Sequence, residues 1–153
     1  MEEVKGIQEA ISDMDVVSKV LHIKKYFEDT PIEDWQMDRI TDYMLVLCTL
    51  LYNVGDLKDE AYIRAEALSE EYKAGVRDEY LKIKNGGEKI TDAMAKAMAE
   101  ERCDGIKQNE LKASLQARKL RGLYEDSNRL IGYTQTKVKT LADNEIRSKI
   151  ERK

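Results

Sequence analysis

The chain contains one proline, Pro31, among its 153 residues, and this scarcity constrains the fold more than any other feature. Proline ends or kinks helices, so a chain that lacks it from residue 32 onward can form helices of several turns without interruption. Charged residues make up 37% of the chain and hydrophobic residues 42%, a balance typical of helices with one apolar and one solvated face. The sequence therefore predicts an all-α fold, an elongated helical bundle with a long antiparallel coiled-coil hairpin.

Two hydrophobic helices are expected in residues 1–55. The first carries one apolar stripe at helical spacing: Val16, Val20, Ile23 and Phe27. It should stop near Asp29, because Thr30–Glu33 has the pattern of a capping box with proline at the first helical position, where a new helix can begin. This second helix is apolar over most of its circumference, and we expect it to end at residues 53–56, with Gly55 in the left-handed conformation.

The sequence predicts a single helical domain that spans residues 1–153. Within it, residues 56–153 are expected to form a long helical hairpin with a short connecting helix. One long helix should run from residue 57 to about 84, where Asn85, Gly86 and Gly87 form a stop signal, and Thr91 can cap the short connecting helix that follows. Another long helix should run from 106 to about 149, which would make it roughly 20 Å longer than the first at about 1.5 Å per residue. The shorter helix cannot cover the whole apolar stripe of the longer one. We therefore predict that a second copy of the chain covers the remainder, in a homodimer. The predicted oligomer interface comprises Leu123, Leu130, Thr134, Val138 and Leu141.

The net charge of −4 conceals an asymmetry along the chain. Residues 102–153 contain 13 basic and 7 acidic side chains, whereas the remaining residues contain 13 and 23. The two parts could pair with each other, within the fold or between subunits. Alternatively, the outer face of the last helix is a basic ridge that neutralises phosphates, with Tyr124 and Tyr133 placed to stack on unpaired bases. The candidate nucleic-acid-binding residues are Lys112, Arg118, Lys119, Arg121, Arg129, Lys137 and Lys139.

Residue types that perform catalysis or bind metal do not gather in any recognisable pattern. The chain has one histidine, His22, and two cysteines, Cys48 and Cys103, without the spacing of a metal site or a disulfide framework. The glycines at 86–87 lack the lysine of a phosphate-binding loop. We therefore expect a non-enzymatic protein with no catalytic residue, no metal and no cofactor. Its reduced cysteines, and a start without the features of a signal peptide, favour a cytoplasmic location.

A longer pattern becomes visible once the helices are placed. Its parts are Leu51–Leu57, a tyrosine-bearing helix from Ala61–Tyr62 onward, Gly86–Ala95, Leu130–Ile131 and Thr134–Lys139, within residues 51–146. This pattern resembles a group of small helical proteins encoded by bacteriophages, often in their replication and recombination regions. The resemblance implies an accessory role, loosely similar to that of phage recombination mediators, which load a recombinase on single-stranded DNA. It also implies a host or phage protein as partner, and the cytoplasm of the host cell as location.

Two alternative functions suit a small phage helical protein. One is an anti-defence inhibitor of the anti-CRISPR type, which would bind a host effector complex and could use its acidic face to compete for a basic groove. The other is a self-assembling structural adaptor whose apolar seam binds a second copy of the chain. All of these are binding functions, and they differ in whether the partner is single-stranded DNA, another protein or the chain itself.

Overall fold

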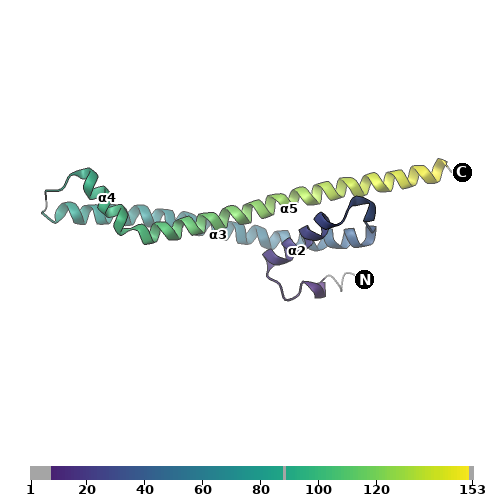
Figure 1. Cartoon of the computed structure of the whole chain (residues 1–153), viewed down its shortest axis with the longest axis horizontal. Coiled ribbons are helices and arrows are strands. Elements are labelled where there is room, and N and C mark those ends of the chain that lie inside the picture. Colours follow the sequence, from purple (N-terminus) through teal and green to yellow (C-terminus); the bar gives the residue numbers. More distant parts are fainter. Residues whose placement is uncertain (1–7, 88, 152–153) are drawn as a thin grey trace. The chain divides into compact units, whose positions relative to one another are not determined.

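The computed structural model describes residues 8–87 and 89–151, and this part of the chain is all-α, as predicted. It contains no strand. The elements are α2 (Val16–Asp29), the 3₁₀ turn η1 (Ile32–Asp34), α3 (Met37–Asn85), α4 (Asp92–Arg102) and α5 (Asp104–Glu151) (Figure 1). The long helices α3 and α5 are antiparallel, which confirms the predicted hairpin.

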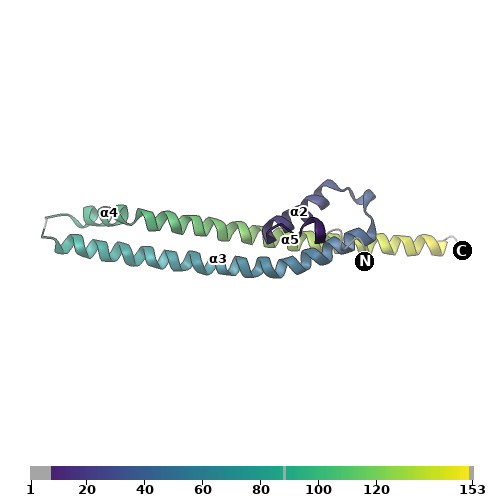
Figure 2. The ribbon, with the colours of Figure 1, turned by 90° about the horizontal axis from the view of Figure 1, so that it is seen from below.

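The chain divides into two compact units. The first unit comprises Met1–Asp56 and Gly122–Lys153, and the second comprises Leu57–Arg121. Each unit therefore contains one part of α3 and one part of α5, which Figure 2 shows running along each other. The sequence-based division instead assigned all of residues 56–153 to one hairpin, whereas residues from 122 onward belong with the N-terminal helices.

The first unit holds the larger hydrophobic core. Asp15 caps the start of α2: its side chain accepts a 2.9 Å hydrogen bond from the Ser18 amide, and this bond lowers the pKa of Asp15. The apolar stripe of α2 then packs against α3 and α5, and the rings of Tyr26 and Tyr43 stack with centroids 4.1 Å apart. The core residues are Ile11, Val20, Ile23, Phe27, Ile40, Leu47, Leu50, Leu51, Val54 and Ile131.

The predicted helix start at Thr30–Glu33 is wrong. These residues lead into the single turn η1, which has no side-chain cap, and α3 begins only at Met37. The indole Nε1 of Trp35 donates a 3.1 Å hydrogen bond to the carbonyl of Thr30, and the Trp35 ring meets Phe27 edge-on at 6.0 Å. Contacts made by Trp35, rather than a capping box, therefore set the path of this connection.

The predicted helix end at residues 53–56 is also wrong, because α3 continues through Gly55 without interruption. A glycine within a helix costs about 1 kcal/mol relative to alanine. The neighbouring Leu51 and Val54 are buried in the core, and burial of such side chains stabilises by roughly 1.5–3 kcal/mol each, which outweighs that cost. Since α3 has 49 residues and α5 has 48, the length difference that motivated a homodimer does not exist, and self-association stays a prediction.

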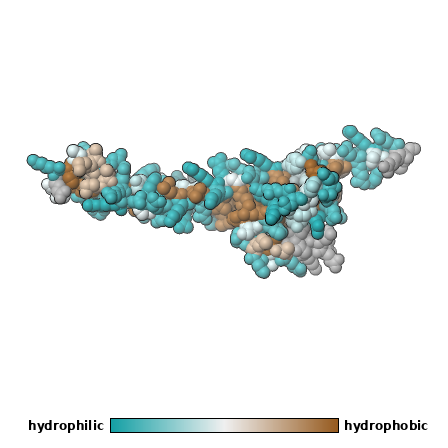
Figure 3. Space-filling view, viewed as in Figure 1, coloured by the Kyte–Doolittle hydropathy of each residue, from teal (hydrophilic) through white to brown (hydrophobic). Residues whose placement is uncertain are grey.

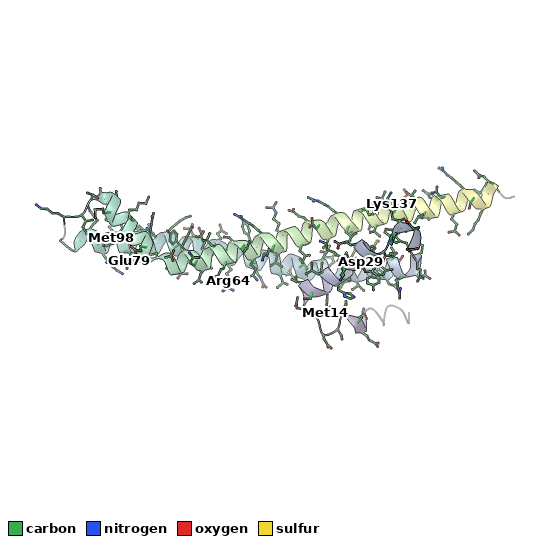
Figure 4. The ribbon with its side chains drawn as sticks, in the orientation of Figure 1. Met14, Asp29, Arg64, Glu79, Met98 and Lys137 are labelled. Carbon is green, nitrogen blue, oxygen red and sulfur yellow. The ribbon has the colours of Figure 1, made fainter. Side chains whose placement is uncertain are left out.

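In the second unit, α4 packs against the last turns of α3. Ile83, Ala95 and Ala99 form a small buried cluster with the half-buried Val76 and Met98 around it; Figure 4 labels Met98. As predicted, Thr91 caps α4, because its hydroxyl accepts a 3.3 Å hydrogen bond from the Met94 amide. The expected stop at residues 85–87 is confirmed as well, with Gly87 at φ +80°.

In the second unit, an ion pair joins α3 to α4, and a close backbone approach joins α3 to the start of α5. Arg102 Nη1 lies 3.1 Å from Glu79 Oε2, a residue labelled in Figure 4. A Cβ atom added at Gly75 would lie 3.3 Å from Cys103 Sγ. Because that distance is tighter than ordinary van der Waals contact, Gly75 allows α3 to approach the start of α5 closely.

Candidate nucleic-acid interface

A groove lies between α3 and α5 in the second unit. Four small side chains on the facing helices leave this space open: Ala65, Ser69, Ser114 and Ala117. Its volume is about 490 Å³, which falls within the range of small-ligand sites. Larger side chains form the rest of the lining: Tyr62, Glu66, Glu70, Lys73, Glu110, Arg118 and Arg121.

The two ends of this groove differ in charge. Because α3 and α5 are antiparallel, Tyr62 lies toward the Arg118 and Arg121 end, and Glu70 lies toward the Glu110 end. The acids of that second end are already paired. Lys73 Nζ is 2.7 Å from Glu70 Oε1, and this hydrogen bond lowers the pKa of Glu70.

Glu110 is paired in the same way. Lys107 Nζ is 2.6 Å from Glu110 Oε2, and the hydrogen bond with Glu110 raises the pKa of Lys107. Lys107 also lies over the ring of Tyr72, 4.8 Å from its centroid. The Glu110 end of the groove is therefore a set of ion pairs, and Arg118, which forms no ion pair with another described residue, lies toward the other end.

Residues 111–121 of α5 form a basic segment, with four basic residues and no acidic one. Lys112, Arg118 and Lys119 are exposed, and none of them forms an ion pair with another described residue. The fourth, Arg121, is exposed but interacts with another residue. The segment therefore presents three cations whose charge is not neutralised by a contact within the described chain.

The three other predicted nucleic-acid-binding residues belong to the first unit, and their surroundings differ. Arg129 is exposed and lies 3.7 Å from Asp126. Lys137, labelled in Figure 4, is half-buried with its Nζ 5.5 Å from the centroid of the Tyr133 ring. Lys139 is exposed. Two of these three cations are thus engaged with a neighbour on α5. Of the seven predicted residues, those without a contact of this kind in the described chain are Lys139 and three members of the segment 111–121.

The two tyrosines predicted to stack on bases lie on α5 in the first unit. Tyr124 is half-buried against the core of that unit, whereas Tyr133 is 49% exposed and lies beside Lys137. Tyr62, by contrast, is 65% exposed and lines the groove with Arg118. The pattern of α5 alone could not indicate Tyr62, which belongs to α3. The available signal was the register of the antiparallel hairpin, which places Tyr62 opposite the basic segment.

The predicted oligomer interface faces the inside of the first unit. Leu123, Leu130 and Val138 are half-buried against its core, Leu141 is half-buried, and Thr134 is fully buried. Contacts within the chain therefore cover part of this stripe, and Thr134 completely, and self-association through the remainder stays a prediction. Figure 3 shows that hydrophobic surface elsewhere occurs as separate patches on a mostly hydrophilic face.

In the described part of the chain, no three histidine, cysteine, aspartate or glutamate side chains lie close enough to hold a metal ion. Within residues 8–87 and 89–151, every helix is too short or too polar to cross a lipid bilayer. Comparison of the chain with protein-family models, with curated proteins and with solved structures found no match.

Proposed function

We propose that this chain is a non-enzymatic binding protein that contacts nucleic acid through the basic segment of α5, as an accessory factor in phage replication or recombination. The observation that carries the proposal is the set of three exposed cations without ion-pair partners, Lys112, Arg118 and Lys119. Such side chains neutralise phosphates and release counterions, which gives binding that is independent of sequence and weakened by salt. The accessory role rests on the resemblance to small phage proteins.

A second candidate function follows from the opposite charge on α3. In the second unit, this helix exposes five acidic side chains within thirteen residues: Asp59, Glu60, Glu66, Glu70 and Glu71. An acidic helical face of this kind can compete with nucleic acid for a basic groove on another protein. This surface suits an anti-defence inhibitor that binds a host effector complex, and such a protein would show little affinity for free DNA.

Fluorescence anisotropy with a labelled oligothymidylate at low salt distinguishes the two candidates. We expect the wild-type chain to bind, and the double variant Arg118→Glu with Lys119→Glu to lose binding. The matched control is Lys25→Glu with Arg147→Glu, which changes the net charge equally at two exposed cations of the first unit.

Retained binding in this control would show that the basic segment, and not the net charge alone, makes the contact. Equal loss in both double variants would contradict the assignment to this segment. Absence of binding by the wild-type chain, with capture of a host protein complex from a nuclease-treated lysate, would favour the inhibitor function instead.

A further inference from the structure

We infer that Tyr62 is a base-stacking residue, and that the groove beside it takes an unpaired nucleobase of a single strand. This inference rests on the nucleic-acid-binding function proposed above and adds the ligand that the site selects. It starts from the ring of Tyr62, which is 65% exposed and lines the groove together with Arg118. An aromatic ring with an open face stacks on any base, so this contact is tolerant of sequence.

The surroundings of Tyr62 leave its ring and hydroxyl available. The hydroxyl makes no hydrogen bond with another described residue. The groove beside the ring is bounded by the small side chains of Ala65 and Ala117, which leave room for a flat group. A base can therefore lie along the ring without displacing a side chain from the core of the second unit.

The charges of the groove orient a nucleotide. Arg118 is exposed, without an ion pair in the described chain, and lies at the same end as Tyr62, so its guanidinium can hold the phosphate next to a stacked base. Glu66 also lines the groove and forms no ion pair with a described residue. Its carboxylate repels phosphate, so we expect the phosphate of the bound strand to lie at Arg118 and the base to lie on the ring of Tyr62.

This arrangement favours single strands over duplex. In a duplex the bases stack on one another and their faces are covered, so only the phosphates remain for the basic segment. Tyr62 should therefore contribute to single-strand affinity and contribute little to duplex affinity. Tyr52 provides a matched control, because it is also on α3 and is 80% exposed, but it does not line this groove.

The test compares the affinity for an oligothymidylate with that for a duplex, measured by anisotropy at one low salt concentration. We expect Tyr62→Ala to lower single-strand affinity about tenfold, as loss of one stacked base does, and to leave duplex affinity nearly unchanged. Tyr62→Phe keeps the ring and should bind like the wild type, and so should Tyr52→Ala. In Tyr62→Trp, single-stranded DNA should quench the added emission relative to the wild-type chain.

Unchanged single-strand affinity in Tyr62→Ala, or an equal loss for both ligands, would overturn the inference while leaving the proposed function intact. Failure of the wild-type chain to bind either ligand would overturn both. A Tyr62→Trp variant that binds the oligothymidylate without a change in emission would also contradict stacking at this position.

Discussion

Asp92, at the start of α4, accepts a 2.6 Å hydrogen bond from Nζ of Lys84, near the end of α3. The hydroxyl of Tyr80 lies 3.3 Å from the same carboxylate oxygen. These contacts join the two helices that meet at the tip of the second unit. The hydrogen bond with Lys84 holds the pKa of Asp92 below its ordinary value.

We expect the substitution Lys84→Met to raise the pKa of Asp92, as measured by NMR titration of its side-chain carboxyl. Because the folded pKa is lowered, this ion pair stabilises the folded chain above the unfolded pKa of Asp92, and the effect is lost as pH falls through the folded value. Asp15 is the internal control, because its pKa is lowered by Ser18 and does not depend on Lys84. An unchanged Asp92 titration would contradict the contact.

Gly55→Ala should stabilise the chain against urea by about 0.5–1 kcal/mol, because alanine favours a helix interior more than glycine does. The added Cβ would lie 3.5 Å from Tyr124 Cε2, an ordinary contact. Gly87→Ala should instead destabilise it, since Gly87 has φ +80°. Unfolding followed by circular dichroism measures both effects. If Gly55→Ala destabilised the chain, the result would support the left-handed helix end at Gly55 that the sequence predicted.

Thr134→Val should stabilise the first unit by about 1 kcal/mol, because a buried hydroxyl without a partner costs free energy. The side chain of Thr134 is fully buried, and its Oγ1 has no hydrogen-bond partner among the residues that the structure describes. Valine keeps the shape and removes the hydroxyl, whereas the control Thr134→Ser keeps the hydroxyl and removes the methyl group. Urea unfolding followed by Trp35 fluorescence should rank valine above threonine above serine, and a less stable valine variant would show that the hydroxyl has a partner.

Two leucines on α3 provide a matched test of the core in the first unit. Leu47 is fully buried, whereas Leu45, two residues earlier, is 62% exposed. We expect Leu47→Ala to lower the free energy of unfolding by about 2–5 kcal/mol and Leu45→Ala to change it by less than about 0.5 kcal/mol. Similar losses in urea unfolding of the two variants would contradict the assigned faces of α3.

Local sequence signals predicted the parts of the fold that local chemistry controls. The apolar stripe of α2, the cap at Thr91 and the stop at residues 85–87 all lie where the pattern placed them. The predictions at Thr30–Glu33 and at Gly55 were wrong, because packing contacts of nearby side chains outweigh the local capping and glycine signals there. The indole of Trp35 fixes the first connection, and burial of the residues beside Gly55 keeps α3 continuous.

The candidate site shows the same limit. The four cations of residues 111–121 follow from the sequence alone, because no acidic residue interrupts them. Tyr62 could not be found in this way, since its place beside Arg118 depends on the register between two helices. The sequence also could not show that Leu130 and Val138 pack against the core of the first unit, because an apolar stripe indicates a covered face without naming the element that covers it.

The most direct measurement of the proposed function is the salt dependence of oligothymidylate binding. If Lys112, Arg118 and Lys119 each neutralise one phosphate, the slope of log affinity against log salt concentration should be about −2 for a single strand. The slope should become much shallower, about −0.7, in the variant Arg118→Gln with Lys119→Gln, which removes these two charges without reversing them and keeps Lys112. Binding that does not change with salt, or an unchanged slope in that variant, would contradict nucleic-acid binding by the basic segment.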